Sequence, residues 1–404
     1  MPFLFRRSRL IFISFFAFGL LNNILYVVIL SAAVDLVGAQ APKATVLLAD
    51  IVPSFLIKLA APFFIQWVSY HHRILILVGL SSIGMLLIGF SSQERLTTKI
   101  AGICMASLSS GLGEFTFLQL THFYDRGSSI AGFSSGTGSA GLLGSFVYMF
   151  LTSVLNVKTW LVLIIFALLP LAFLFVFYGV LPTMEVKVMD VESEAGDDQI
   201  QGYFAKKPLS RKVVNHFSGT VNKAAFLFFP YMLPLGLVYI CEYVINQGIS
   251  PTLLFPLESV PSWLLSSYRD FYVVYGFLYQ LGVFFSRSSV SLGIRIKNLY
   301  LLAILQAFNV IIVTFQSLYD SPFASLLTLS FLIFYEGLLG GFLYVNTFMS
   351  VSEQMPAHMR EFSMGCVGIS DTFGVMVAGC ISWFIEPFLC QLQVKRGKDW
   401  CTIG

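Results

Sequence analysis

Charged residues are scarce in this sequence. Asp, Glu, Lys and Arg make up 11% of its 404 residues, against ~25% in soluble domains. Hydrophobic residues make up 57%, and the mean hydropathy is +0.81. Too few polar side chains remain to cover a surface in water. The composition therefore excludes a soluble domain and predicts a protein that crosses a membrane several times.

The sequence also lacks the motifs of several function classes. It has no P-loop, which argues against direct use of ATP. Its six cysteines show no CxxC or Cys/His spacing, so neither a metal site nor a cofactor is expected. The net charge of +3 comes without a basic tract interleaved with aromatic residues, which argues against nucleic-acid binding.

Two features resemble parts of membrane enzymes without completing them. The letters GLGE at 111–114 are similar to the GLGD of intramembrane aspartyl proteases, but Glu replaces Asp and no Tyr-Asp lies on an earlier span to supply the second acid. His71 and His72 form a lone pair without the spaced histidine boxes of membrane di-iron enzymes. The sequence therefore does not predict an enzyme.

Apolar segments of the length that crosses a bilayer, ~20 residues, occur eleven times. The first is too long for the ~7 to 15 residues of a cleaved signal core, so it is read as a span. The expected spans are Leu10–Val34, Ala44–Trp67, Ile74–Ser91, Thr98–Thr121, Ser129–Leu155, Thr159–Val180, Lys223–Gly248, Tyr268–Ser286, Leu299–Leu318, Pro322–Val351 and Phe362–Phe388.

The longest polar stretch, 181–222, divides these spans into six and five. It is acidic first and basic afterwards, with the composition of a disordered linker. We predict an all-α polytopic membrane protein with a six-helix bundle (1–180), a cytosolic linker (181–222), a five-helix bundle (223–388) and a luminal tail (389–404). This 6+5 layout is that of a major facilitator without its last helix.

The distribution of Lys and Arg predicts the orientation. With the N-terminus in the cytosol, fifteen of the 24 lie on the cytosolic side and eight on the opposite side, while Lys58 lies inside a span. Because cytosolic loops carry an excess of Lys and Arg, a cytosolic N-terminus is favoured. The usual Asp/Arg/Gly loop of facilitators between spans two and three is degenerate here and reads QWVSYHHR.

Polar and ionisable groups at bilayer depth are the candidates for function, because they are costly there. A single buried acid can serve only to lock two helices, but the whole set is better explained by a water-filled path for a solute and protons. The candidates are Asn22, Asn23, Tyr26, Asp50, Lys58, Glu114, His122, Glu242, Asn246, Gln247, Tyr275, Tyr279, Gln280, Arg287, Glu336, Asn346 and Asp371. For the tyrosines, the alternative is packing in the hydrophobic core without contact to a ligand.

Two of these groups need partners. Lys58 lies two turns from Asp50, ~12 Å along the helix, so the two are not expected to pair. Its partner is expected to be Glu114 or Glu336. Glu114 and Glu336 are expected to face one central cavity and to change protonation between an acidic lumen and a neutral cytosol. Ser134–Ser145, almost all small residues, is expected to pack closely against another helix.

Several blocks, in one order, resemble the battenin family, which includes the protein lost in juvenile Batten disease. They are FGLLNNILYVVILSAA (18–33), LLADIVPSFLIKLAAPFF (47–64), GLGEFTFLQLTHFY (111–124), SSGTGSAGLLGS (134–145), EYVINQG (242–248), EGLLGG (336–341), YVNTF (344–348) and ISDTFG (369–374). The resemblance implies a facilitator-like protein of the vacuolar or lysosome-like membrane, reached through Golgi and endosomes. It also implies roles in vacuolar pH balance, arginine levels and glycerophosphodiester clearance.

The expected function is therefore secondary transport across the vacuolar membrane, linked to protons, with arginine-like basic amino acids or glycerophosphodiesters as solutes. The excess of intramembrane acids favours protons or a cation, whereas Lys58, His122 and Arg287 favour a phosphodiester. The alternative is a scaffold that does not transport and acts on trafficking through protein partners of the 181–222 loop. For both the transporter and the scaffold, the expected partners include the lipid bilayer and do not include nucleic acid.

Two expectations concern the luminal side. The segment 257–270, with Trp263 beside Pro261, is expected to lie along the membrane surface, where Trp is favoured. The C-terminal letters CTIG have the outline of a prenylation signal, but a luminal tail is out of reach of cytosolic transferases. A disulfide between Cys390 and Cys401 is expected instead, since the secretory route is oxidising.

Overall fold

The computed structural model describes residues 2–32, 36, 44–91, 95–155, 157–183, 220–256, 258 and 268–397, and the regular structure of these residues is helical. The α-helices are α1 (Pro2–Ser31), α3 (Ala44–Phe64), α4 (Tyr70–Phe90), α5 (Leu96–Leu120), α6 (Arg126–Met149), α7 (Thr159–Leu168), α8 (Leu171–Phe175), α11 (Leu233–Tyr243), α12 (Tyr268–Arg287), α13 (Leu299–Tyr319), α14 (Leu326–Gln354), α15 (Ala357–Val367) and α16 (Ile369–Lys395). Short π or 3-10 turns extend several of them, including η2 (Thr121–Phe123), η4 (Val176–Val180) and η6 (Val244–Ile249).

Nine helical stretches in the described part of the chain are long and apolar enough to cross a membrane; one of them, Thr159–Val180, joins α7, α8 and η4. They correspond to nine of the eleven predicted spans. The other two predicted spans fall on α6, with 24 residues, and α12, with 20, which have the length of a span but are not among those nine. The many Gly, Ser and Thr residues of α6 lower its hydropathy without shortening it.

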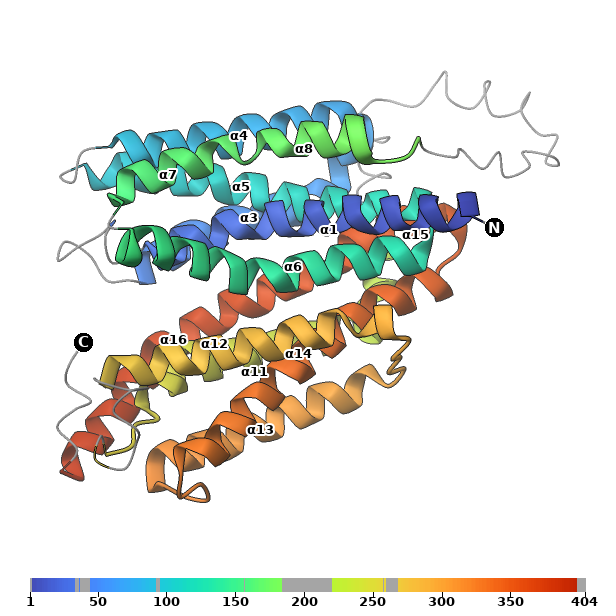
Figure 1. Cartoon of the computed structure of the whole chain (residues 1–404). Helices are drawn as coiled ribbons and strands as arrows, with labels where there is room; N and C mark the ends of the chain where they lie inside the picture. Colours follow the sequence, from blue (N-terminus) through green and yellow to red (C-terminus); the bar gives the residue numbers. More distant parts are fainter. Residues whose placement is uncertain are drawn as a thin grey trace, which may run out of the picture.

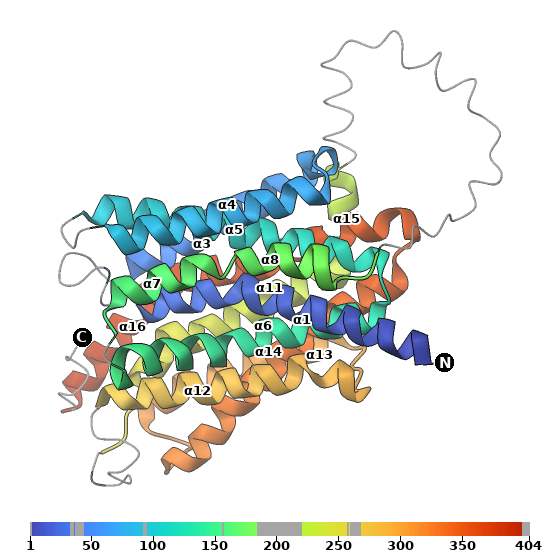
Figure 2. The same cartoon turned by 45° about the horizontal axis from the view of Figure 1, so that its top comes forward.

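The helices form two bundles that lie side by side (Figure 1). The blue to green helices, α1 to α8, make up the N-terminal half, and the yellow to red helices, α11 to α16, the C-terminal half. In Figure 2, turned by 45°, the two halves overlap, and α12 lies near the lower edge. Helix α1 begins at one end of the assembly, here named the α1 end, and α16 finishes at the other. An odd number of spans requires this arrangement.

Contacts between the halves join α3 with α16, α6 with α12 and α14, and α5 with α15. A buried apolar cluster continues across this boundary, with Phe115 and Leu118 from the N-terminal half and Tyr344 and Phe348 from the C-terminal half among its members. Two further clusters lie within the separate halves. Each half therefore has its own core, and the shared cluster joins them near α15.

Close helix packing explains the small residues of α6, as predicted. A Cβ atom added at Gly136 would lie 2.1 Å from the carbonyl oxygen of Phe16 on α1, and one at Gly19 of α1 would lie 2.3 Å from that of Phe133. On the other face, a Cβ at Gly141 would lie 2.2 Å from Oε1 of Gln280 on α12. Helix α6 thus packs directly against the backbone of α1 on one face and against the Gln280 side chain of α12 on the other.

Replacing Gly136 by Ala is expected to destabilise the protein by about 1–3 kcal/mol, because backbone atoms of α1 would have to move. Gly276→Ala is the matched control, since nothing lies within 4 Å of a Cβ added at Gly276 on α12. The melting temperatures of the purified proteins in detergent measure the difference. Equal melting temperatures for the two variants would contradict the close packing.

The last predicted span is interrupted in the structure. Helix α14 ends at Gln354 and α15 begins at Ala357, so a short connection at 355–356 separates the last two predicted spans. A second break falls at Gly368, which caps α15 and precedes α16. Helix α15 packs against α5 of the other half, near the α1 end (Figure 1). The break at Gly368 places the start of α16 between the two halves.

Candidate functional site

A cavity of about 110 Å³ lies between the halves. Helices α1, α3 and α5 line it from the N-terminal half, and α11, α12, α14 and α16 from the C-terminal half. The lining residues are Asn23, Tyr26, Asp50, Ile51, Ser54, Lys58, Ser110, Glu114, Tyr239, Tyr243, Arg287, Tyr344, Asp371, Thr372 and Val375. Sites for small molecules usually measure ~300–1,000 Å³. This cavity must therefore widen before it can take up a solute.

Lys58 is the centre of a charged cluster at this cavity. Its side chain is 2% exposed, and its Nζ donates to Glu114 Oε2 at 2.5 Å, to Thr372 Oγ1 at 2.5 Å and to Asp371 Oδ1 at 3.3 Å. The carbonyl oxygen of Gly368 lies 3.3 Å from the same Nζ. Of the two partners expected for Lys58, the structure selects Glu114. Because Glu114 belongs to one half and the other acceptors to the other half, this ammonium group joins the two halves.

The break at Gly368 prepares the C-terminal side of the cluster. The Gly368 carbonyl at this break accepts from Lys58, and Asp371 lies in the first turn of α16. There Asp371 Oδ1 accepts from the backbone N–H of Thr372 at 2.5 Å, and the positive end of the helix dipole favours its charge. A discontinuous helix supplies both a carbonyl and a carboxylate to this cluster, as in other membrane transport folds.

Arg287 holds a second positive charge at the cavity. Its guanidinium donates to Thr137 Oγ1 of α6 and to the Tyr239 hydroxyl of α11, both at 2.7 Å, and lies 4.2 Å from the ring centre of Tyr344. None of the salt bridges between described residues includes Arg287. Its Nε atom has no acceptor among them. Unlike Lys58, Arg287 keeps a charge that no carboxylate neutralises by direct contact.

Asp50 lies on the N-terminal side of the same cavity. It is 3% exposed, and its Oδ2 has no donor among the described residues. Lys58 makes no bond to it, in agreement with the separation of two helical turns. Asn23 and Tyr26 of α1 complete this wall, and the Asn23 amide donates to the carbonyl oxygen of Gly19 at 3.2 Å. The cavity thus has an acidic group on one side and Arg287 on the other.

Another set of predicted residues lies inside the C-terminal half. Asn246 donates to Glu336 Oε1 and to the carbonyl oxygen of Glu242, both at 3.0 Å, and Tyr279 donates to Glu242 Oε1. Neither Glu242 nor Glu336 lines the central cavity. The expectation that Glu114 and Glu336 face one cavity is therefore wrong for Glu336. The side chain at 336 points between α11 and α14 instead.

The remaining predicted residues serve the framework. Tyr275 donates to the carbonyl oxygen of Leu253 at 2.9 Å within the C-terminal core, which is the core role weighed for the tyrosines. Asn22 donates to the carbonyl oxygen of Ser110 at 3.1 Å and ties α1 to α5. Gln247 is half-buried on η6, and Gln280 contacts Gly141.

Two predicted residues lie away from the cavity, towards the α1 end. Asn346 Oδ1 accepts from Arg295 at 2.7 Å and from the backbone N–H of Ile296 at 2.9 Å, and so holds the connection between α12 and α13. His122 lies in η2, where its ring packs edge-on against Phe123. Residues at helical spacing form a stripe along one face of a helix, and such stripes in the sequence could not separate these two residues from those at the cavity.

Sequence reasoning missed a second link between the halves. Arg73 is buried and donates to the carbonyl oxygens of Ile65 and Val68 and to the side chain of Gln119. Beside it, the Tyr70 hydroxyl donates to Glu361 on α15 at 2.7 Å. The loop that reads QWVSYHHR therefore does connect the halves, although it lacks the usual facilitator motif. The one sequence feature of this loop that could have indicated such a role is its single arginine, Arg73.

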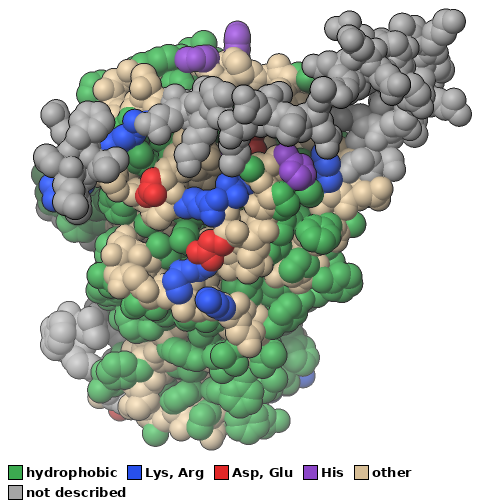
Figure 3. Space-filling model, turned by 90° about the vertical axis from the view of Figure 1, so that its right-hand side faces the viewer, with side chains coloured by type: hydrophobic (Ala, Val, Ile, Leu, Met, Phe, Trp, Pro, Cys, Tyr) green, Lys and Arg blue, Asp and Glu red, His purple; other side chains and the backbone are tan. Residues whose placement is uncertain are grey.

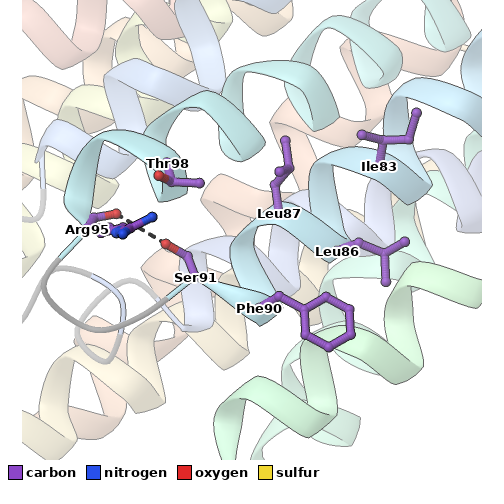
Figure 4. A pocket seen from close by; sticks show the side chains of 7 residues that line it. All are labelled: Ile83, Leu86, Leu87, Phe90, Ser91, Arg95 and Thr98. Carbon is purple, nitrogen blue, oxygen red and sulfur yellow. Dashed lines mark hydrogen bonds between the residues drawn. The ribbon is translucent and has the colours of Figure 1, made fainter.

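A larger hollow, of about 450 Å³, lies on the outside of the N-terminal half (Figure 4). Ile83, Leu86, Leu87 and Phe90 of α4 form its wall, and Ser91, Arg95 and Thr98 lie together at one end. Ser91 donates to the carbonyl oxygen of Arg95 at 3.2 Å. Most of its lining is apolar, and none of its lining residues belongs to the central cavity. The central cavity is therefore the better candidate for function.

Three expectations fall on residues outside the described ones. The linker lies mostly at 184–219 and the expected interfacial segment mostly at 257–267. Cys390 is disulfide-bonded, whereas Cys104, Cys241, Cys366 and Cys380 are free. Cys401, the partner expected for Cys390, also lies outside the described residues. The pairing and the placement of both segments stay predictions.

The fold and the central cavity define a class of protein. The chain superposes on the proton:xylose symporter XylE with a TM-score of 0.57 and 14% identity, over 100% of this chain and 96% of that one. The human organic anion transporter MFSD10 gives a TM-score of 0.60 and 13% identity, over 98% and 96%. This is a multi-pass membrane protein with the major facilitator fold.

Within that class its family is also defined. Residues 13–392 match the CLN3 protein family. Protein BTN1 of Debaryomyces hansenii is 62% identical over 100% of this chain and 99% of its own length. Protein BTN1 of Candida albicans is 56% identical over 100% and 99%, and that of Saccharomyces cerevisiae is 46% identical over 98% and 99%. The chain belongs to the CLN3 family, as its resemblance to battenins predicted.

Proposed function

We propose that this protein is a proton-linked secondary transporter of the vacuolar or lysosome-like membrane, for a small solute that carries an anionic and a cationic group. The observation that supports this most is Arg287, a cation at the central cavity with no carboxylate in contact. A buried charge of this kind is costly unless another group compensates for it. An anionic group of a solute would provide that compensation.

The opposite wall suits the cationic part of the solute. Asp50 offers a carboxylate, and the tyrosines at 26, 239 and 243 offer aromatic faces that attract cations. A basic amino acid such as arginine carries a carboxylate for Arg287 and cationic groups for Asp50. A glycerophosphodiester with a choline or ethanolamine group carries a phosphate and a cation with the same roles. The site chemistry thus supports both solute classes that the sequence suggested.

The Lys58 cluster has a different part in the proposal. Its ammonium group is already bound by two carboxylates, so it has little to offer a solute. Like the hydrogen bond from Tyr70 to Glu361, it links the N-terminal half to the segment 361–372 of the C-terminal half. Alternating access requires such links to break when one half rocks against the other. The contacts of Lys58 therefore hold the two halves together and keep the cavity closed towards the α1 end.

The orientation belongs to the same proposal. Lys and Arg side chains gather near the middle of the α1 end face, with acidic side chains between them (Figure 3). The first residue of α6, Arg126, and the connection between α12 and α13, with Arg295 and Lys297, belong to this end. An excess of positive charge favours the cytosolic side. The closed end would then face the cytosol.

Uptake into proteoliposomes tests the function. The purified protein is reconstituted with an acidic or a neutral interior and offered arginine, lysine, glycerophosphocholine or a neutral sugar as control. We expect uptake of one of the charged classes, dependent on the pH difference, and none of the sugar. If no member of the panel moves at any pH difference, the transporter is refuted and the scaffold acting through the 181–222 loop becomes the better explanation.

A further inference from the structure

We propose that Glu242 and Glu336, inside the C-terminal half, form a proton-binding site separate from the cavity that takes the solute. This inference rests on the proposed function, because it assigns the proton of a proton-linked transporter. The site lies between η6, α11, α12 and α14, and it is joined to the solute cavity through Tyr239, Tyr243 and Arg287.

The two carboxylates occupy one buried polar cluster. Both residues are 1% exposed. Asn246 bridges them, since its amide donates to Glu336 Oε1 and to the backbone of Glu242. Glu242 Oε1 accepts from Tyr279, and its Oε2 lies against Gly340, where an added Cβ would be 2.2 Å away. Gly340 is one helical turn beyond Glu336, so both acids meet the same stretch of α14.

No cation contacts this pair within the part of the chain that the structure describes. The salt bridges found there include neither Glu242 nor Glu336. The titratable groups around them are Tyr239, Cys241 and Tyr243 of α11, Tyr279 and Arg287 of α12, and Asp371 of α16. Arg287 acts on Glu242 only through space. This contrasts with Glu114 and Asp371, which share the ammonium group of Lys58.

Two ionised carboxylates cannot be buried together without a partner, because each one loses its hydration and repels the other. At least one proton therefore resides on the pair in this conformation. The donors present fit that state. Asn246 and Tyr279 each donate to one carboxylate oxygen, and Oε2 of Glu242 has no hydrogen-bond partner among the described residues. A protonated, neutral oxygen costs less in such a place than an ionised one.

The pair communicates with the solute site through Arg287. Tyr239 and Tyr243 line the cavity on either side of Glu242, and Tyr239 accepts from Arg287. When the pair loses its proton, the new negative charge attracts the Arg287 guanidinium and competes with the anionic group of a solute. When a proton binds, Arg287 is released for the solute. Proton binding and solute binding are thereby coupled across one arginine.

Infrared spectroscopy tests the proton site without any solute. Protonated carboxylic acids absorb at a carbonyl band that ionised ones lack, and we expect part of this band to persist at neutral pH in the full-length protein. Glu242→Gln and Glu336→Gln should each reduce it, and Glu353→Gln, an exposed acid paired with Arg295, should leave it unchanged. Because Asp50 is also buried, the assignment uses the difference between wild type and each variant. An unchanged band in both variants would overturn the inference.

Tyr279→Phe provides a second test if either glutamine variant fails to fold. It removes the donor to Glu242 Oε1 and keeps the ring, so the pH at which the band disappears should move upwards. No shift would count against the site. In proteoliposomes, Glu242→Gln and Glu336→Gln should lose accumulation driven by a pH difference but keep exchange of solute at equal pH. If the wild type moves no solute, the proposed function fails, while the infrared result still decides whether the pair holds a proton.

Discussion

Lys58→Met is expected to lower the free energy of unfolding by about 3–5 kcal/mol, because removal of one partner leaves buried charges without compensation. The side chains of Lys58 and Glu114 are 2% and 13% exposed, so solvent screens them little. Glu114 and Asp371 would then face each other across the boundary between the halves with no cation to separate them. This ammonium group thus contributes both to stability and to the joining of the halves. The melting temperature of the purified variant in detergent measures the loss.

Two further variants separate charge from packing in this prediction. In a Lys58→Met and Glu114→Gln double variant, one of the stranded charges is gone, so part of the stability should return. Arg396→Met is the matched control, because its bridge to Asp320 is 41% and 43% exposed and such bridges contribute ~0–1 kcal/mol. If Lys58→Met melts no lower than Arg396→Met, the buried cluster does not stabilise the fold.

The fold was largely predictable from the sequence because a bilayer imposes one strong rule. Every backbone polar group must be satisfied inside its own segment, so long apolar runs become helices with little dependence on context. The eleven spans follow from this rule even at α6, whose small residues fill a close contact with α1. The break at Gly368 was not predictable in the same way. A glycine in an apolar run is compatible with an unbroken helix. Whether the helix breaks at Gly368 depends on contacts with Lys58, which lies on another helix and far away in the sequence.

The site was predictable in its residue types but not in its grouping. Costly polar groups at bilayer depth indicate function, and the structure brings Asp50, Lys58, Glu114, Arg287 and Asp371 to one cavity. Helical stripes gave the face of each residue and not its depth or its neighbour on another helix. Glu336 was therefore grouped with Glu114, although it lies with Glu242. The tyrosines at 239 and 243 carry no charge, so they were not distinguished from core residues.

Arg287→Gln is expected to weaken binding of the transported solute by about 10- to 150-fold. Hydrogen bonds to charged groups contribute about 1.5–3 kcal/mol each, and every 1.4 kcal/mol corresponds to a factor of ten in affinity. The glutamine retains a donor for Thr137 or Tyr239, so the contacts between α6, α11 and α12 are only partly lost. What disappears is a cation at the cavity that no carboxylate among the described residues contacts. The half-saturating concentration in the proteoliposome assay measures the change.

Arg287→Lys is the comparison that identifies the reason. It keeps the positive charge but not the planar fork that holds Thr137 and Tyr239 together. If the charge binds an anionic group of the solute, the lysine variant should bind more tightly than the glutamine variant, whichever solute class is transported. Melting temperatures of both variants control for misfolding, and Arg295→Gln, near Asn346 and away from the cavity, controls for loss of a surface charge. A glutamine variant with the affinity of the wild type and an unchanged melting temperature would show that the solute does not bind at Arg287.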